Sequence, residues 1–198
     1  MPLPTELHMP ALSDLRPNQG ALILNIVFNR GFPDDDLLRR HFVNLVRLVD
    51  LSVAEYETAR SHLHASLPSG QNRLGSLLSA TDHLELCVIT VHRALNALDS
   101  VIRRPEAPKI SRDARRALRA FEGTLSGTRH AIEHIEERIS NGQVQTGQSH
   151  ALLVSQDGKT ASIGPHQLSL EALGAAIRRL HELVAQTLIL HSTTGQQH

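Results

Sequence analysis

Apolar residues recur at intervals of three and four along most of the chain, and this spacing predicts amphipathic helices. Four such segments stand out, at residues 34–66, 72–103, 111–140 and 168–190. Residues that favour helix ends separate them, namely Asp34 or Asp35 and Ser111 as N-caps, and Pro68, Pro105 and Asn141-Gly142 as breaks. The pattern therefore predicts a mainly α chain built as an up-down bundle of four long helices.

Two other segments carry a strand pattern. Residues 21–28 are apolar, contain β-branched side chains and lie between Gly20 and Gly31. Two short apolar runs within residues 150–164 flank Asp157-Gly158, which predicts a β-hairpin. Because an isolated hairpin is only marginally stable, the strand at 21–28 is a candidate third strand of the same sheet. Residues 1–33 are thus predicted as an N-terminal arm with a short strand, and residues 34–198 as the bundle with its hairpin insertion.

Composition narrows the class of protein. Hydrophobic residues make up 40% of the 198, no apolar run approaches the ~18 residues of a membrane span, and no secretory signal pattern is visible, so we expect a cytoplasmic protein without membrane contact. Cys87 is the sole cysteine, which excludes an intramolecular disulfide. The formal net charge is zero, so charge alone does not predict nucleic-acid binding by the whole chain. Aromatic residues make up 3%, which disfavours a base-stacking sheet.

The third predicted helix carries groups capable of chemistry on its polar side. Its isoleucines share the apolar side of the helical wheel, and the opposite half holds five polar residues: Arg129, His130, Glu133, His134 and Glu137. An imidazole titrates near neutral pH and can take or give a proton, and a guanidinium can hold a phosphate through paired hydrogen bonds.

The run Arg129-His130-Ala131-Ile132-Glu133-His134 resembles the ribonuclease motif of HEPN proteins, in which an arginine and a polar residue precede a histidine on a bundle helix. The resemblance covers this helix closely and the bundle loosely. It implies a metal-independent endoribonuclease that leaves 2′,3′-cyclic phosphate ends at a homodimer cleft, with Arg129 and His134 as catalytic residues. It also implies a role as a toxin or defence component and a neutralising partner protein. His130, Glu133 and Glu137 would form the supporting polar face.

Other interpretations of the same residues stay open. The polar side is equally typical of a solvated helix face with an Arg129–Glu133 pair, in a non-catalytic helical-bundle scaffold of the same fold. His130 and His134 have metal-ligand spacing, but no third ligand cluster accompanies them, and His83 with Cys87 is a weaker pair. No glutamate begins a Glu-x-x-His pair, which disfavours a di-iron bundle. We therefore expect no metal and no cofactor.

Overall fold

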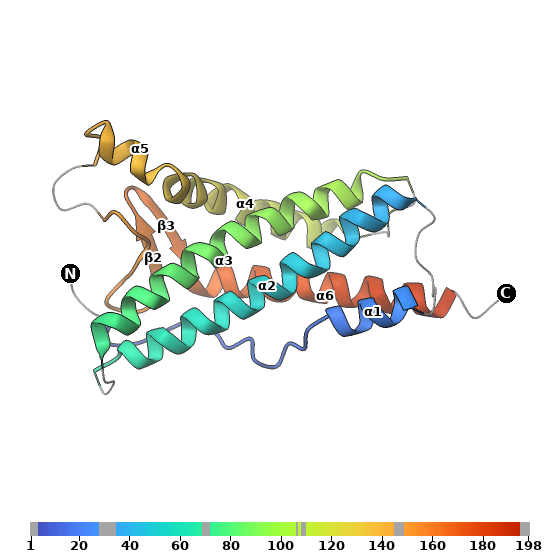
Figure 1. Cartoon of the computed structure of the whole chain (residues 1–198), viewed down its shortest axis with the longest axis horizontal. Helices are drawn as coiled ribbons and strands as arrows, with labels where there is room; N and C mark the ends of the chain where they lie inside the picture. Colours follow the sequence, from blue (N-terminus) through green and yellow to red (C-terminus); the bar gives the residue numbers. More distant parts are fainter. Residues whose placement is uncertain are drawn as a thin grey trace.

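The protein is mainly helical and carries one small three-stranded antiparallel sheet (Figure 1). Its computed structural model describes residues 4–27, 35–68, 72–105, 107, 110–144 and 149–194, with side chains to residue 188. In chain order the elements are α1 Gln19–Val27, α2 Asp36–Ser66, α3 Arg73–Ile102, α4 Arg112–Glu133, α5 Ile135–Ser140, β1 Leu153–Val154, β2 Thr160–Ile163, β3 His166–Ser169 and α6 Leu170–Thr194. The prediction of a mainly helical chain is confirmed.

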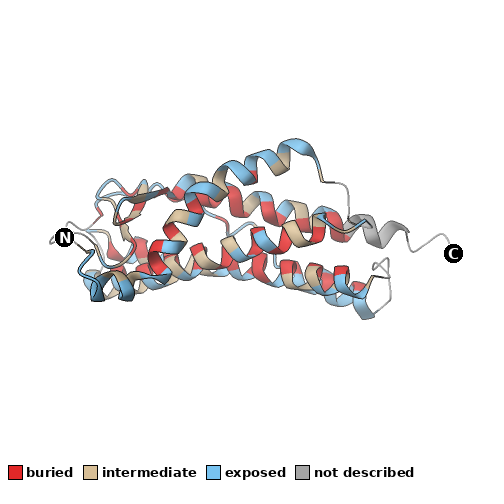
Figure 2. Cartoon of the chain, turned by 90° about the horizontal axis from the view of Figure 1, so that it is seen from above, coloured by how far each residue is buried: buried red, intermediate tan, exposed pale blue. Residues whose placement is uncertain are grey.

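The two longest helices, α2 and α3, pack against each other along their length (Figure 1). Asp35 caps α2 as predicted, because its side chain accepts hydrogen bonds from the N–H groups of Leu37 and Leu38 at 2.9 and 3.2 Å. Buried residues lie on the facing sides of the helices and exposed residues on the outside (Figure 2). Among the described residues α3 alone is long and apolar enough to cross a membrane, but it packs on α2 as the core helix of a soluble protein does.

The other long helices complete the core around this pair. Helix α6 packs on α2 and α4, and α4 packs on α3 and on β3. Ser111 caps α4 as predicted, accepting a hydrogen bond from the N–H of Ala114 at 3.2 Å. The buried side chains of all these elements form one hydrophobic cluster, which positions α4 with its remaining side outward.

The sheet confirms the predicted hairpin and corrects the predicted third strand. β1 pairs with β2 across Asp157-Gly158, with Leu153 opposite Ser162. β2 then turns at Gly164, whose φ is +56°, and pairs with β3 from Thr160 opposite Ser169 to Ile163 opposite His166. The third strand is thus β3, and residues 21–27, the described part of the predicted strand, do not join the sheet.

The strand predicted at residues 21–28 is wrong over the described part of that segment, where the chain forms α1. The buried carboxylate of Asp50 on α2 accepts hydrogen bonds from the N–H groups of Asn18 and Gln19 at 3.0 and 2.9 Å, so it satisfies donors at the helix start. Asn25, about two turns further on, donates to the carbonyl of Leu188 at 3.2 Å. These contacts come from residues distant in sequence, and they outweigh the local β preference.

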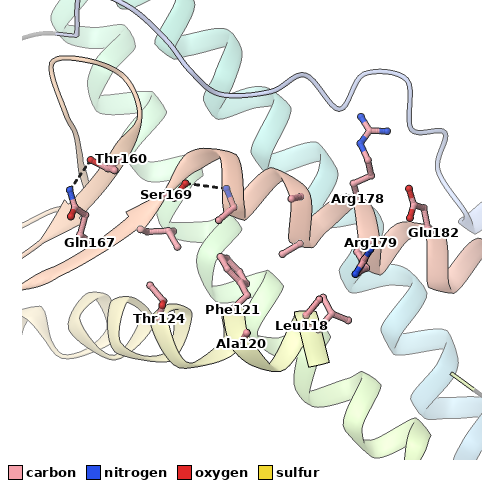
Figure 3. A pocket seen from close by; sticks show the side chains of 15 residues that line it. Leu118, Ala120, Phe121, Thr124, Thr160, Gln167, Ser169, Arg178, Arg179 and Glu182 are labelled. Carbon is pink, nitrogen blue, oxygen red and sulfur yellow. Dashed lines mark hydrogen bonds between the residues drawn. The ribbon is translucent and has the colours of Figure 1, made fainter. Parts of the chain in front are cut away.

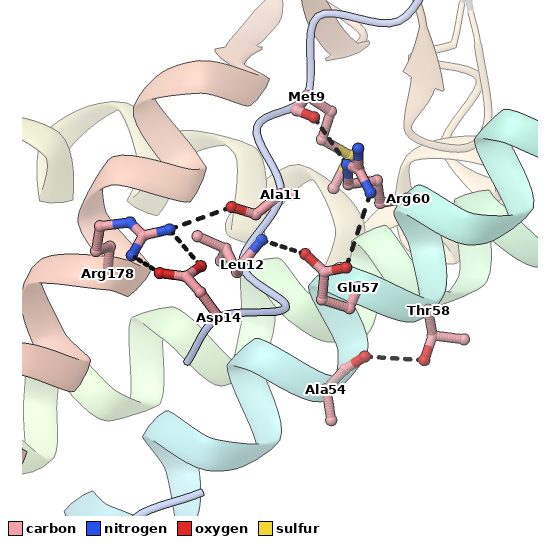
Figure 4. A network of polar contacts seen from close by, with 9 residues as sticks. All are labelled: Met9, Ala11, Leu12, Asp14, Ala54, Glu57, Thr58, Arg60 and Arg178. Carbon is pink, nitrogen blue, oxygen red and sulfur yellow. Dashed lines mark hydrogen bonds and ion pairs between the residues drawn. The ribbon is translucent and has the colours of Figure 1, made fainter. Parts of the chain in front are cut away.

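Residues 4–18 form an arm that lies along α2 and α6 and is held by polar contacts (Figure 4). Arg178 on α6 makes two hydrogen bonds to the Asp14 carboxylate, at 2.6 and 2.8 Å, which lower the pKa of Asp14. Arg60 on α2 donates to the carbonyl of Met9 at 3.0 Å, and Glu57 accepts from the N–H of Leu12. The arm is therefore part of the folded unit.

The start of the arm docks on the turn of the hairpin. Thr5 donates its N–H to the carbonyl of Gln156, and His8 donates to that of Gly158, both at 3.0 Å. Gly158 has a φ of +63°, and a Cβ added there would overlap the carbonyl oxygen of Glu6 and lie 2.7 Å from the Cα of Leu7. Both the backbone conformation and the close approach of the arm require glycine at this position.

We expect Gly158→Ala to lower the free energy of unfolding by about 2 kcal/mol or more, because it adds a steric overlap to left-handed strain. Gly142→Ala is the matched control, since Gly142 has a φ of +64° and open space around its Cβ position. Left-handed strain alone predicts a loss of about 1 kcal/mol there. Urea denaturation of both variants checks this, and equal losses would show that the arm does not dock on the turn.

A second prediction concerns Glu85 on α3, whose carboxylate accepts a hydrogen bond from the N–H of Leu152 at 2.9 Å. Desolvation is the main cause that raises the pKa of Glu85 in the folded protein, so the folded state binds this proton more tightly than the unfolded chain. Stability is therefore lost as pH rises from the ordinary glutamate range through the raised pKa. Glu85→Gln keeps an acceptor and removes the charge.

We expect the Tm of Glu85→Gln to exceed that of the wild type at pH 7, and the difference to shrink as pH falls toward 4. Thermal melts followed by circular dichroism across this range make the comparison. A difference that is the same at every pH would show that Glu85 is not destabilised by its burial.

Candidate functional site

The predicted site lies on the outward side of α4 and α5. The opposite side of α4 is buried, with Leu125 at 0% and Ile132 at 8% exposure. The five predicted residues share the outward side: Arg129 is half-buried, while His130, Glu133, His134 and Glu137 are exposed. The structure thus brings together all five residues predicted from the sequence.

Arg129 is paired within its own helix. Its guanidinium forms an ion pair with Glu133, four residues later, and the two side chains are 34% and 30% exposed. A partly exposed pair of this kind contributes about 0.5 kcal/mol or less, so an anion bound nearby can compete for the guanidinium. The pair holds Arg129 in place on the outer surface and does not bury it.

His134 lies at a break in the helix that the sequence pattern did not predict. The expected single helix to residue 140 ends at Glu133, and α5 begins at Ile135, because His134 has φ −108° and ψ 18°. Its Nδ1 atom lies 3.1 Å from a carboxylate oxygen of Glu137. An ionised carboxylate only accepts hydrogen bonds, so in the neutral imidazole this contact places the proton on Nδ1 and leaves Nε2 as the acceptor.

A second imidazole adjoins the first. The rings of His130 and His134 have centroids 4.3 Å apart and planes tilted by 45°. The backbone N–H of His134 also donates to the carbonyl of His130 at 3.1 Å, which fixes the spacing of the two residues. The break in the helix therefore presents two neighbouring imidazoles and one carboxylate to the outside, a set of groups that can give and take protons.

Gly127, just before this segment, permits a close approach from the sheet. A Cβ at this position would lie 2.8 Å from Nδ1 of His166 on β3. Arg138 on α5 likewise approaches Gly164, where a Cβ would lie 3.2 Å from its guanidinium nitrogens. The sheet thus supports the underside of the α4–α5 break.

Metal-binding interpretations gain no support from the described residues. No group of three or more His, Cys, Asp or Glu side chains in the described ranges could hold a metal ion. The weak candidate pair of His83 and Cys87 has separate partners: Nδ1 of His83 lies 2.6 Å from a carboxylate oxygen of Glu55, and Cys87 is buried. Burial raises the pKa of the Cys87 thiol, so Cys87 stays a protonated side chain of the core.

Sequence analysis missed a contact between α2 and α3. His62 stacks on His83, with ring centroids 5.7 Å apart and planes 7° from parallel, and His83 is bonded to Glu55. The pairing arises from the register of α2 on α3, which no local pattern reports.

Sequence analysis also missed a groove between α4, α6 and the sheet (Figure 3). Its volume is about 880 Å³, and its lining is mostly apolar, with Leu118 and Phe121 from α4 and several alanines from α6. Gln167 and Thr160 stand at the sheet end, joined by a hydrogen bond of 3.0 Å, and Arg179 and Glu182 stand on α6. Ala120 also lines a neighbouring hollow of about 610 Å³, called here the arginine hollow, whose other residues are Arg112, Arg115, Arg116 and Arg119.

Comparisons of the chain with protein-family models, with curated proteins and with solved structures found no match.

Proposed function

We propose that this protein is a metal-independent endoribonuclease of HEPN type, in which α2, α3, α4 and α6 form an up-down bundle and two copies join to make the active cleft. The arrangement of His134 carries the proposal. Its Nδ1 faces the Glu137 carboxylate at 3.1 Å, and the side chain is 45% exposed. An imidazole held in one tautomer, with Nε2 directed away from its carboxylate, has the form of a general base.

The proposed reaction uses the 2′-hydroxyl of RNA as the nucleophile. Nε2 of His134 accepts the hydroxyl proton, and the 2′-oxygen attacks the adjacent phosphorus. The bond from phosphorus to the 5′-oxygen of the next nucleotide breaks, and that oxygen takes a proton from a protonated imidazole. The products are a 2′,3′-cyclic phosphate and a 5′-hydroxyl, and no metal ion enters the balance.

Arg129 has the role of the phosphate clamp. Negative charge grows on the non-bridging oxygens during the attack, and a guanidinium stabilises it through charge-assisted hydrogen bonds. The ion pair with Glu133 holds the guanidinium in the resting protein, and an RNA phosphate would replace the carboxylate. In the resting protein, the carboxylate of Glu133 thus occupies the position beside Arg129 that the RNA phosphate would take.

The dimer follows from the need for an acid as well as a base. One His134 accepts a proton while another imidazole donates one, and a second copy of the chain facing the first would supply it across the cleft. His130, 4.3 Å away between ring centroids, is placed to assist within the same copy. A toxin or defence role in the cytoplasm, with a neutralising partner, is part of the same proposal.

One observation favours the alternative, a non-catalytic scaffold of the same fold. The Arg129–Glu133 pair neutralises the guanidinium in the protein as it stands. In a scaffold this pair would be a stabilising surface contact and nothing more. The two proposals differ in what happens when either partner of the pair is removed.

We expect the purified protein to cleave single-stranded RNA in EDTA, and His134→Ala to lower the rate by about 100-fold or more, the usual contribution of a general acid or base. Arg129→Ala should lower it as severely, because charge on the phosphate is then unopposed. Analysis of the ends should find cyclic phosphate. His92→Ala and Arg93→Ala on α3 are the controls. If Arg129→Ala and His134→Ala cleave RNA as fast as these controls, the nuclease proposal is refuted.

Glu133→Gln separates the two proposals. Removal of the competing carboxylate frees Arg129 for phosphate, so the nuclease proposal predicts a lower KM for RNA with kcat little changed. The fold should lose about 0.5 kcal/mol or less, because only one exposed ion pair is removed. Absence of RNA cleavage by both the wild type and Glu133→Gln, with a fall in Tm as the only effect of the substitution, would support the scaffold.

A further inference from the structure

We propose that the arginine hollow and the groove beside it form a binding site for single-stranded RNA, with phosphates in the hollow and a base in the groove. This site deepens the proposed function by naming where the substrate is held, and it rests on that function for its biological ligand. Three observations carry the proposal: the unpaired charge of the hollow, the chemistry of the groove, and the continuity of the hollow with His134.

The arginine hollow concentrates positive charge that the described protein does not neutralise. Within residues 112–122 there are four arginines and two acids, Asp113 and Glu122, in a chain whose net charge is zero. Arg112, Arg116 and Arg119 are exposed, and Arg115 is half-buried. No carboxylate among the described residues lies within ion-pair distance of any of them.

These arginines do not stabilise α4. The first turn of a helix carries partial positive charge, so Arg112 and Arg115 are unfavourably placed, and the four guanidinium groups also repel one another. A bound polyanion would relieve both costs. Guanidinium groups match phosphate oxygens in paired geometry, which points to phosphate as the anion.

The groove offers a stacking face and hydrogen-bonding groups for a nucleobase, which a polyphosphate ligand would not use. Phe121 extends from α4 toward α6 within it (Figure 3), and its ring offers a face on which a nucleobase can stack. Gln167 and Thr160 have donors and acceptors to spare beyond their mutual hydrogen bond, and these can meet a base edge. Since Ala120 lines both cavities, a phosphate in the hollow and its base in the groove belong to one short stretch of chain.

The hollow is continuous with the proposed catalytic residues. At 100° per residue, Arg112, Arg116, Arg119 and His130 fall within about 60° on the α4 wheel. Between Arg119 and His130 the same side carries Gly123 and Ser126, which are exposed and small, and a Cβ at Gly123 would meet nothing within 4 Å. Arg119 and His130 are eleven residues apart, which corresponds to about 16 Å of helix, a length that a few nucleotides of an extended strand can cover. RNA held at the hollow can thus run along α4 to His134.

Binding is measured without cleavage, in the full-length His134→Ala protein, by fluorescence anisotropy with a short labelled oligouridylate. We expect Arg116→Glu with Arg119→Glu to weaken binding at least tenfold. If the four arginines each neutralise one phosphate, a fourfold rise in monovalent salt should weaken binding of the unmodified hollow about 50-fold. Phe121→Leu, which keeps an apolar side chain but removes the stacking face, should weaken binding about fivefold or more.

The matched control is Arg47→Glu with Arg93→Glu, which makes the same charge change on α2 and α3. Equal affinities of the two double variants, at equal Tm, would overturn the proposal. Inorganic polyphosphate as competitor tests the groove: Phe121→Leu should leave its affinity unchanged, and an equal loss for polyphosphate and RNA would show that no base enters the groove. Tighter binding of an aspartate-rich peptide than of RNA would assign the hollow to a protein partner and overturn the proposal as well.

If the hollow binds RNA but the wild type does not cleave it, the nuclease fails and the binding site stands. If cleavage depends on His134 while the hollow variants bind and cleave normally, the nuclease stands and this site fails. The two proposals are therefore separable by the same set of proteins.

Discussion

The two-sided packing of α4 is the constraint on which the rest of the structure depends. One side, with Leu118, Leu125 and Ile132, is buried against α3, α6 and the sheet. Burial of a large aliphatic side chain contributes about 1.5–3 kcal/mol, so these contacts fix the rotation of the helix about its axis. Because the rotation is fixed, the arginines at the start of α4 and the histidines at its end must both face outward. The arginines of the hollow and the histidines proposed for cleavage share one surface for this reason.

The supports of α4 explain why that surface is shaped as it is. β3 meets the helix at Gly127, where only a hydrogen atom leaves room for His166. Near the other end, α6 stays far enough from α4 to leave the groove that Phe121 lines. The arm contacts α6 through the hydrogen bonds between Asp14 and Arg178. Because α4 packs closely on β3 at Gly127 and lies further from α6 near Phe121, a groove lies beside the arginine hollow.

The sequence was most informative where local signals and tertiary packing agree. The start of α2 at Asp35, the cap of α4 at Ser111 and the turn at Gly158 were all predicted, because each depends on a side chain or glycine acting on its own neighbours. The strand expected at residues 21–28 was wrong for the opposite reason. Asp50, some thirty residues later in the chain, satisfies the donors at the start of α1.

The residues of the candidate site were predicted from the sequence, but their geometry was not. The helical wheel placed Arg129, His130 and His134 on the polar side, as the structure has them. The break at His134 was not expected, since no glycine or proline marks it, and neither was the contact of His134 with Glu137 as the orienting group. The groove arises from the spacing of α4 and α6, which one-dimensional patterns do not contain.

The most direct test of the central claim, that RNA binds and reacts along the outward side of α4, is a photocrosslink. An RNA with methylated 2′-hydroxyls and a photoreactive uracil is bound to the wild-type protein, irradiated, and the crosslinked peptides are identified by mass spectrometry. The account predicts crosslinks within residues 112–134 and to the α6 and β3 residues that line the groove. Crosslinks confined to the outer faces of α2 and α3 would contradict it.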